Sequence, residues 1–240
     1  MSRALWGMGL LCALLSSAAA MAAEADAPRV NADPVFPFSN EIAAFATAND
    51  AGAALPDATL FLGSSSIRLW DIRASFPDTG TINRGFGGAT TRDVLHYYPR
   101  LLPRAKPRSI IVYVGENDLA AGATPAEVSR NILTLLKRLR ADYPKARIAC
   151  LSLKPSPIRW TLWPKLAAVN MTVAARSRVT GFDYLDVGSV LLAPDGLPDA
   201  SLFRPDGLHM NPRGYLRWTR TVDAWLDRTQ LVQNDSAAPS

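Results

Sequence analysis

The chain has 240 residues, 48% of them hydrophobic and 20% charged, with a formal net charge of +5 at pH 7. This length and hydrophobic content are enough for one domain with a sizeable core. The basic excess is mild, and the basic clusters at residues 100–108 and 137–140 lack the interleaved aromatic side chains that stack on bases. We therefore expect a solvated basic face and no nucleic-acid partner, although attraction to an anionic surface or glycan stays open.

The first 23 residues predict a secretory signal peptide. Arg3 precedes an apolar run at residues 5–15, and mostly small residues follow as far as Ala23. A charged start, a short apolar core and an Ala-x-Ala-like end are typical of such a segment, with cleavage between Ala20 and Ala23. We expect an exported protein, periplasmic or secreted, with no membrane span after processing. A retained anchor helix is the alternative, for which the apolar run is short.

Cysteine and histidine are scarce, with two of each in the chain. Cys12 lies in the predicted signal peptide, after Leu11, where a lipid-attachment signal needs a small residue, so we do not expect a lipoprotein. Cys150 is then a single thiol in an apolar run typical of a buried strand, and it cannot form an internal disulfide. Two separated histidines and one thiol do not supply a tight ligand set, so we expect no metal site.

The rest of the chain alternates between short apolar runs and helical patterns. We expect a linker at residues 24–37, one folded domain at residues 38–232 and a disordered tail at residues 233–240. The patterns predict strands at residues 58–62, 81–83, 109–114, 147–153 and 182–187. They predict helices at residues 40–48, 91–102, 125–141, 165–178 and 212–228. The helix at 125–141 is the clearest, with Thr124 as its N-cap and Pro125 as its first residue.

Strands that alternate with helices pair in parallel, with helices on both faces of the sheet. The sequence therefore predicts a three-layer α/β/α sandwich, a doubly wound parallel sheet of about five strands. In such an open sheet, functional residues gather beyond the carboxyl ends of the strands. Four polar or glycine-rich segments are expected there, at residues 63–66, 85–91, 115–118 and 206–209.

A serine, a histidine and an aspartate in these segments suggest nucleophilic catalysis. His209 follows Asp206 by three positions in a glycine-containing turn, so the carboxylate can hold one ring nitrogen and leave the other free as a base. Such a base needs a nucleophile, and Ser65 lies in a serine-rich turn after the first strand of the sheet. These three residue types together predict a serine hydrolase.

Acyl transfer also needs N–H donors for the oxyanion that develops on the substrate. The glycine-rich turn at residues 85–88 can offer a backbone N–H, and Asn117 can offer a side-chain amide. Ser66 is the alternative nucleophile, and His96, within a helical pattern, is expected to be structural or on the surface. Each segment alone is compatible with an ordinary turn. Their order along one alternating fold favours the catalytic interpretation.

These segments resemble the four sequence blocks of the SGNH hydrolases, the GDSL-type esterases and lipases. The residues that name the family match, in the same order, Ser65, Gly88, Asn117 and His209. The resemblance implies a flavodoxin-like sheet, with Ser65 as nucleophile, His209 as base and Asp206 as its orienting partner. It also implies that the oxyanion is bound by the backbone N–H groups of Ser65 and Gly88 and by the side chain of Asn117. With its predicted signal peptide, the chain looks like a secreted bacterial-type member.

Two positions depart from the family pattern. Ser64 stands where the family usually has Asp, so the turn has Gly-Ser-Ser-Ser in place of Gly-Asp-Ser. Because that Asp is not one of the four naming residues, we expect activity to survive. Glu116 stands where a small residue is common and is expected to shape or charge the acyl pocket. An α/β-hydrolase is rejected, because Ile67 replaces the second glycine of its nucleophile elbow and Asp206 is only three residues from His209.

We therefore predict a carboxylic ester hydrolase that forms an acyl-enzyme on Ser65 and releases it with water, without a cofactor. The substrate is expected to be an acylated glycan, a lysophospholipid or another small acyl ester. The loop at residues 154–160 is expected to wall the pocket, and Trp160 and Trp163 either line it or pack helices. Two alternatives stay open. One is a non-catalytic glycan- or lipid-binding module on the same fold, and the other is an O-acyltransferase in which a sugar hydroxyl replaces water.

Overall fold

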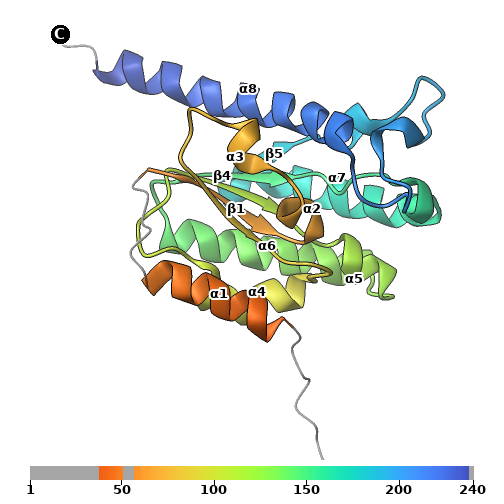
Figure 1. Ribbon diagram of the computed structural model, residues 1–240, viewed down its shortest axis with the longest axis horizontal. Helices are drawn as coiled ribbons and strands as arrows, with labels where there is room; N and C mark the ends of the chain where they lie inside the picture. Colours follow the sequence, from red (N-terminus) through yellow and green to blue (C-terminus); the bar gives the residue numbers. More distant parts are fainter. Residues whose placement is uncertain (1–37, 51–56, 238–240) are drawn as a thin grey trace, which may run out of the picture. The chain divides into compact units, whose positions relative to one another are not determined.

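The computed structural model describes residues 38–50 and 57–237, which contain a parallel sheet of five strands between two layers of helices (Figure 1). The strands are β1 (Thr59–Gly63), β2 (Thr81–Gly85), β3 (Ser109–Tyr113), β4 (Arg147–Leu151) and β5 (Asp183–Leu185). Their spatial order is β2-β1-β3-β4-β5, with every neighbouring pair parallel. This is the flavodoxin-like order, so the predicted doubly wound α/β/α fold is confirmed. The predicted signal peptide and linker lie outside the described residues.

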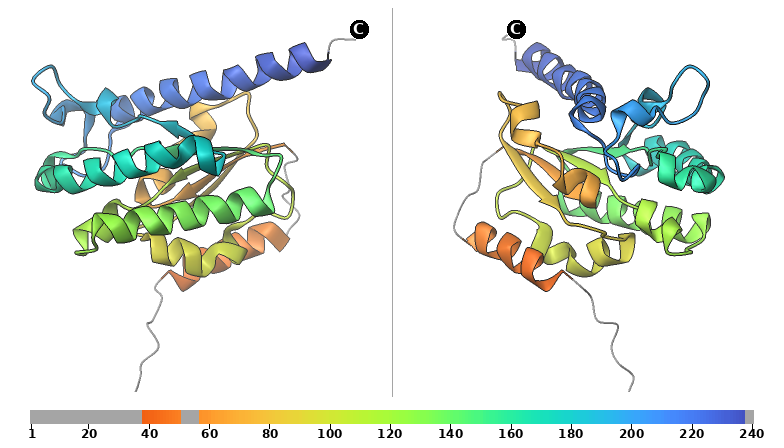
Figure 2. Two further views of the ribbon diagram at one scale, coloured as in Figure 1. Left: turned by 180° about the vertical axis from the view of Figure 1, so that it is seen from behind. Right: turned by 45° about the vertical axis from the view of Figure 1, so that its right-hand side comes forward.

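The longer helices cover the two faces of the sheet as right-handed crossovers require (Figures 1 and 2). One face carries α4 (Thr91–Leu101), α6 (Pro125–Asp142) and α7 (Trp163–Thr180), with α1 (Ser39–Asp50) packed on α4. The opposite face carries α8 (Pro212–Ala237) and the short helices α2 (Ser65–Arg68) and α3 (Ile72–Ser75). Among the described residues, no helix is both long and apolar enough to cross a membrane.

The helix α6 begins where its sequence predicts. The side chain of Thr124 accepts a hydrogen bond from the backbone N–H of Glu127, and the Glu127 carboxylate accepts one from the N–H of Thr124. Pro125 occupies the first helical position. The apolar stripe of this helix is buried and faces the sheet; it comprises Val128, Ile132, Leu135, Leu136 and Leu139.

Several elements are shorter or longer than their sequence patterns predict. The strand β5 ends at Leu185, because the side chain of Asp186 accepts hydrogen bonds from the N–H groups of Gly188 and Ser189 and so forms a turn. The strand β4 ends at Leu151. Two residues further on, both backbone groups of Leu153 bond to a side chain of α7 rather than to a strand.

The helix α8 continues to Ala237, where a disordered tail from Gln233 is predicted. The difference has a simple origin, because the sequence contains no Gly or Pro between Gly214 and Pro239 to end the helix. The last three residues of the predicted tail lie outside the described residues.

Short helices follow the strands directly and escape sequence prediction. The helices α2, α3 and α5 (Glu116–Ala120) have four, four and five residues, too few to show a helical period. The same holds for the 3₁₀ helices η1 (Pro157–Leu162), η2 (Ser189–Leu191) and η3 (Ala200–Leu202). Two of these short elements, α2 and α5, begin at the carboxyl ends of β1 and β3.

Aromatic side chains fill the core between the sheet and α8. Trp70, between α2 and α3, is buried, and its ring centroid lies 5.6 Å from that of Phe61 on β1. The rings of Tyr215 and Trp218 on α8 lie 5.8 Å and 5.7 Å from the Trp70 ring. Such rings bury large apolar areas and prefer specific mutual angles. This cluster therefore fixes the start of α8 against the segment that follows β1.

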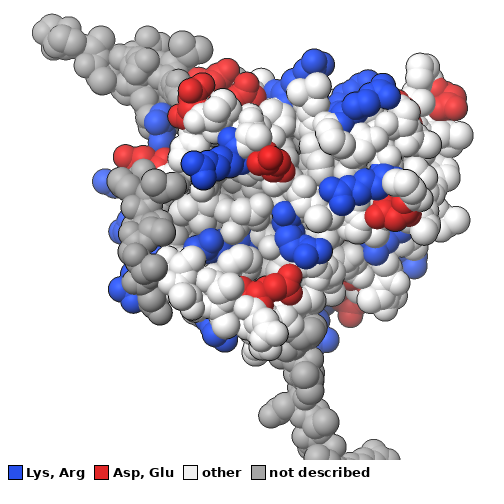
Figure 3. Space-filling model, viewed as in Figure 1, with Lys and Arg blue, Asp and Glu red and all other residues white. Residues whose placement is uncertain are grey.

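Basic residues of the predicted solvated face have structural contacts as well. The guanidinium of Arg140 donates hydrogen bonds to the backbone oxygens of Gly181, just after α7, and Ala146, just before β4. The guanidinium of Arg138 lies 3.9 Å from the ring centroid of Tyr98. On the face drawn in Figure 3, Lys and Arg side chains form separate groups among uncharged residues. On this face the basic charge is thus spread out.

The single thiol of the described residues is expected to be unreactive. Cys150 is buried in β4, and burial raises the pKa of its thiol to about 12. Because the thiolate is the reactive form, a chain begun at Glu24, which lacks Cys12, should react with a disulfide reagent at about pH 8 only after denaturation. Thiol titration in native buffer and in guanidinium measures this. Rapid reaction in native buffer would contradict the buried position.

Candidate active site

The serine-rich turn begins where β1 passes very close to β3. Gly63 has φ +153°, and a Cβ atom at this position would lie 1.9 Å from the backbone oxygen of Tyr113. The next N–H, that of Ser64, donates a hydrogen bond to the same oxygen, at 3.0 Å. Only glycine fits this crossing. The chain then turns directly into α2, which places Ser65 at the carboxyl end of β1, where it is partly exposed.

The structure brings Ser65, His209 and Asp206 together in one hydrogen-bonded row. The Oγ atom of Ser65 lies 3.1 Å from Nε2 of His209, across 144 positions of sequence. The Nδ1 atom of His209 lies 2.7 Å from Oδ2 of Asp206. The row has the geometry of a nucleophile, a base and an orienting carboxylate.

The turn at residues 206–209 holds its carboxylate from two sides. Oδ1 of Asp206 accepts hydrogen bonds from the backbone N–H groups of Leu208 and His209, at 2.8 Å and 2.9 Å. Burial alone would raise the pKa of Asp206, but these bonds and the bond from the His209 ring outweigh it and lower that pKa to about 2. The carboxylate is therefore charged at neutral pH and can keep the ring oriented.

The rival residues are placed elsewhere. The side chain of Ser66 is buried, and its backbone oxygen accepts a hydrogen bond from the hydroxyl of Tyr215, at 3.0 Å. This bond ties the serine turn to α8, just after the histidine turn. His96 is exposed on α4, with its ring 4.7 Å from that of Tyr97. The structure therefore pairs His209 with Ser65 and agrees with the prediction that His96 is a structural or surface residue.

The turns that carry the other two predicted oxyanion donors, Gly88 and Asn117, are joined to each other. Gly88 is exposed, with φ +76°, in the turn after β2. Asn117, in the first turn of α5, donates a hydrogen bond from Nδ2 to the backbone oxygen of Ala89, at 3.0 Å. This bond joins the glycine turn to the carboxyl end of β3. Ser65 is the first residue of α2, where backbone N–H groups have no acceptor within the helix.

Glu116 is buried and paired with two cations rather than presenting a free carboxylate, which differs from the expectation that it charges the acyl pocket. Its side chain is only 4% exposed, and Oε2 lies 2.8 Å from Nζ of Lys154 and 2.7 Å from the hydroxyl of Tyr113. Oε1 lies 3.2 Å from Nη1 of Arg159. Burial alone would raise the pKa of Glu116, but the attraction of Lys154 and Arg159 outweighs it and lowers that pKa. The carboxylate is thus charged, and two cations compensate it.

Asp118, in the same short helix, holds the start of α4. The buried carboxylate of Asp118 accepts two hydrogen bonds from Thr91, one from the backbone N–H at 3.0 Å and one from the side-chain hydroxyl at 2.5 Å. Asn131 of α6 donates to the same hydroxyl. The start of α4 is therefore locked to α5. The structural roles of Glu116, Asp118, Lys154 and Arg159 were not predicted. The available signal is that charged residues occur within a few positions of the ends of two buried strands.

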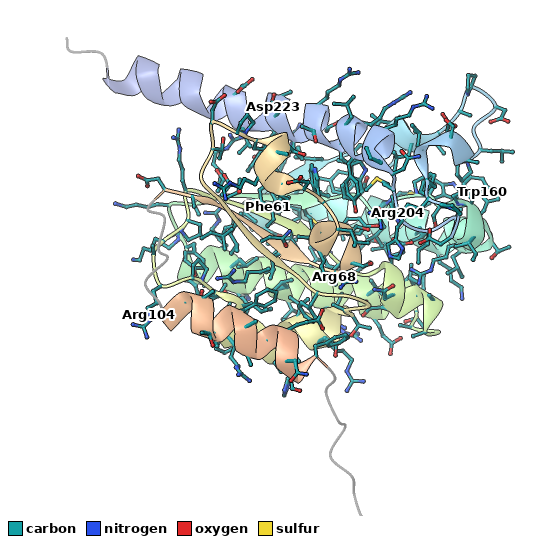
Figure 4. All side chains as sticks on the ribbon, in the orientation of Figure 1. Phe61, Arg68, Arg104, Trp160, Arg204 and Asp223 are labelled. Atoms are coloured by element: carbon teal, nitrogen blue, oxygen red, sulfur yellow. The ribbon has the colours of Figure 1, made fainter. Side chains whose placement is uncertain are left out.

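The loop at residues 154–160 borders the histidine turn. The N–H of Ile158 donates a hydrogen bond to the backbone oxygen of Gly207, at 3.1 Å, and the Ile158 side chain is 67% exposed. The rings of Trp160 and Trp163 stack on each other, with centroids 5.6 Å apart, and both are partly exposed. Figure 4 shows Trp160, Arg68 and Arg204 toward the end of the sheet where α2, α5 and the start of α8 lie.

Other possible sites lie away from the serine or are absent. A hollow of about 850 Å³ lies at the amino ends of β4 and β5, lined by Arg147, Asp183 and Trp225 among others, and thus at the opposite end of the sheet. Within residues 38–50 and 57–237, no group of three or more His, Cys, Asp and Glu side chains is placed to hold a metal ion.

Comparison with known proteins identifies the family. Residues 65–217, which include the serine, histidine and aspartate of the row, match the GDSL-like Lipase/Acylhydrolase family. The chain belongs to this family. It is a carboxylic ester hydrolase of the GDSL-like type, as the sequence predicts.

Curated relatives of this acylhydrolase include mammalian enzymes. Platelet-activating factor acetylhydrolase IB subunit alpha2 of Rattus norvegicus is 31% identical over 174 residues, which are 68% of this chain and 72% of the relative. The isoamyl acetate-hydrolyzing esterase 1 homolog of Bos taurus is 29% identical over 160 residues, 55% of this chain and 63% of the relative.

Solved structures share the fold of this acylhydrolase at low sequence identity. A GDSL-like lipase from Bacteroides thetaiotaomicron superposes with a TM-score of 0.66 at 19% identity, covering 78% of this chain and 98% of the other. The esterase EstA from a Pseudoalteromonas species gives a TM-score of 0.57 at 18% identity, covering 71% and 99%.

The Tyr215 hydroxyl is expected to stabilise the serine turn. Tyr215→Phe removes the donor to the buried oxygen of Ser66, and the loss of such a bond costs about 1–3 kcal/mol. We expect the free energy of unfolding, measured by urea denaturation, to fall by that amount. Tyr143→Phe, at the end of α6, is the matched control. Equal stabilities of the two variants would contradict the proposed contribution of the hydrogen bond.

Proposed function

We propose that this acylhydrolase cleaves its ester by two-step acyl transfer, with Ser65 as nucleophile, His209 as general base and Asp206 as orienting partner. The row of hydrogen bonds from Ser65 through His209 to Asp206 carries this proposal. The Asp206 carboxylate holds Nδ1–H of the imidazole, which leaves Nε2 without a proton and aimed at the serine hydroxyl.

In the first step, the Ser65 oxygen bonds to the ester carbonyl carbon while its proton moves to Nε2 of His209. The tetrahedral intermediate collapses, the alcohol leaves with that proton, and the acyl group stays on Ser65. In the second step, water attacks the acyl carbonyl carbon while its proton moves to Nε2 of His209. The bond between that carbon and the Ser65 oxygen then breaks, His209 returns the proton to Ser65, and the carboxylic acid is released. No cofactor takes part in either step.

The developing oxyanion would be stabilised by three N–H donors. These are the backbone N–H groups of Ser65 and Gly88 and the side-chain amide of Asn117. The support is that the Asn117 amide bonds to the residue after Gly88, which brings the turn after β2 and the turn after β3 to the same place. Donors fixed before reaction favour the transition state over the ground state.

We propose a short acyl group, acetyl first, as the group that is removed. The relatives support it, since one is a platelet-activating factor acetylhydrolase IB subunit and another an isoamyl acetate-hydrolyzing esterase homolog. For the alcohol part, an acylated glycan, a lysophospholipid or another small ester is proposed. The stacked rings of Trp160 and Trp163 and the exposed side chain of Ile158 supply apolar surface beside the histidine turn.

Two further proposals follow from the sequence. Ser64 replaces the usual Asp before the nucleophile without loss of activity; it is buried at the start of α2, and its N–H bonds to Tyr113. The signal-peptide pattern of the first 23 residues supports export of a secreted bacterial-type enzyme to the periplasm or the medium.

Labelling with a fluorophosphonate probe tests the nucleophile. We expect wild type and Ser66→Ala to be labelled and to hydrolyse p-nitrophenyl acetate, and Ser65→Ala to do neither, because only Ser65 lies within hydrogen-bond distance of His209. Mass spectrometry locates the label. A folded wild type that is not labelled would instead support a non-catalytic binding module, and a label retained in Ser65→Ala would exclude this mechanism.

The proposed acyl group is tested with a series of p-nitrophenyl esters of increasing chain length. We expect kcat/KM to be highest for acetate and to fall for butyrate and octanoate as the chain outgrows the site. A higher value for octanoate would reject the short-acyl proposal. Adding a sugar alcohol to the same assay, with product analysis for the acylated sugar, distinguishes transfer from hydrolysis.

A further inference from the structure

A buried ionic cluster lies directly behind Asn117. It consists of Lys154, Glu116 and Arg159, with side chains 1%, 4% and 19% exposed. Lys154 is 2.8 Å from one carboxylate oxygen of Glu116, and Arg159 is 3.2 Å from the other. Two cations share one carboxylate, so the cluster keeps one uncompensated positive charge.

Packing alone does not explain this cluster. Removing ions from water is expensive, and a buried ion pair is often no more stabilising than apolar side chains of the same volume. Glu116 comes from α5, Lys154 from the segment after β4 and Arg159 from η1. These three segments of the chain meet next to Asn117. A buried charged cluster beside a proposed oxyanion donor is a candidate for a functional role.

Arg159 also contacts Asn117 itself. Its Nη1 donates a hydrogen bond to Oδ1 of Asn117, at 3.0 Å. On the other side, Nδ2 of Asn117 donates to the backbone oxygen of Ala89, also at 3.0 Å. A guanidinium can only donate and a backbone oxygen can only accept, so one orientation of the amide satisfies both neighbours. That orientation leaves the second N–H of Nδ2 for a further acceptor.

We propose that Arg159 is a positioning residue for the oxyanion hole. Glu116, itself held by Lys154 and Tyr113, attracts the guanidinium of Arg159 in an ion pair of 3.2 Å. The hydrogen bond from Arg159 then holds the Asn117 amide with its free N–H toward the substrate oxygen. This inference rests on the proposed function of Asn117 as an oxyanion donor. Without Arg159, only the bond to the backbone oxygen of Ala89 holds the amide, so its free N–H is aimed less firmly at the developing oxyanion.

The charge of the cluster acts in the same direction. A cation that donates to Oδ1 polarises the amide and strengthens the N–H donor on its far side, as in other hydrogen-bond chains of low local dielectric. The uncompensated positive charge favours a transition state that carries a negative oxygen. Both effects are stronger in the transition state than in the bound substrate, so they belong to kcat rather than to KM.

A double-mutant cycle with Asn117 tests this inference on p-nitrophenyl acetate, a neutral substrate. We expect Arg159→Met to lower kcat by about tenfold to a hundredfold with little change in KM, and Asn117→Ala to lower it by about a hundredfold or more. Since Arg159 acts mainly through Asn117, most of the loss caused by Arg159→Met should disappear in the Asn117→Ala background, and only the smaller direct effect of the charge should remain. Arg159→Lys, which keeps the charge and one donor, should recover part of the loss.

Arg220→Met, an exposed arginine on α8, controls for the loss of one positive charge. Thermal melts confirm that each variant is folded, and if Arg159→Met does not fold, Arg159→Lys in both Asn117 backgrounds serves the same cycle. The inference is overturned if the loss persists in full in the Asn117→Ala background, or if the loss appears only in KM. It is also overturned if the loss is confined to an anionic ester such as 4-acetoxybenzoate, which would make Arg159 a substrate-binding residue.

Failure of the proposed function has a different signature. In that case wild type itself is not labelled by the fluorophosphonate, or Ser65→Ala keeps the turnover of wild type. Failure of the present inference leaves both of those results as expected and changes only the response to Arg159.

Discussion

The parallel pairing of β1 with β3 is the constraint on which the site depends. The two strands run side by side until Gly63 lies opposite Tyr113, and there the backbones approach so closely that only a glycine fits. Beyond that point the chain leaves β1 toward one face and β3 toward the other, which opens the crevice of a doubly wound sheet. The serine comes from one side of the crevice and Asn117 from the other.

Ser65 and His209 lie far apart in the sequence, and it is the packing of the core, rather than their own hydrogen bond, that holds them side by side. A single bond of 3.1 Å between partly exposed groups contributes little. The aromatic cluster of Trp70, Tyr215 and Trp218 joins α8 to the segment after β1, and Tyr215 bonds to the carbonyl next to the serine. The apolar core thus supplies the stability that holds the polar row in place, which allows the row itself to serve chemistry.

Charge is distributed unevenly between the two sides of the site. On the histidine side, Asp206 is exposed and held by backbone N–H groups, and its low pKa keeps one negative charge beside the imidazole. On the oxyanion side, the buried cluster of Lys154, Glu116 and Arg159 leaves one positive charge. This polarity matches a reaction in which an imidazolium forms on one side and an oxyanion on the other.

The sequence by itself determined the alternation of strands and helices, the start of α6 at Thr124, the sheet edge at which the polar segments gather, and the residues of the row. These are local features, since periodicity, caps and short motifs depend on neighbouring residues. Only the tertiary structure decided that Glu116 turns inward to Lys154 and Arg159, that Asp118 locks the start of α4, and that β4 ends before Leu153. Each of these depends on a partner more than fifteen residues away, and a single sequence carries no signal for such contacts because they form only when distant segments pack.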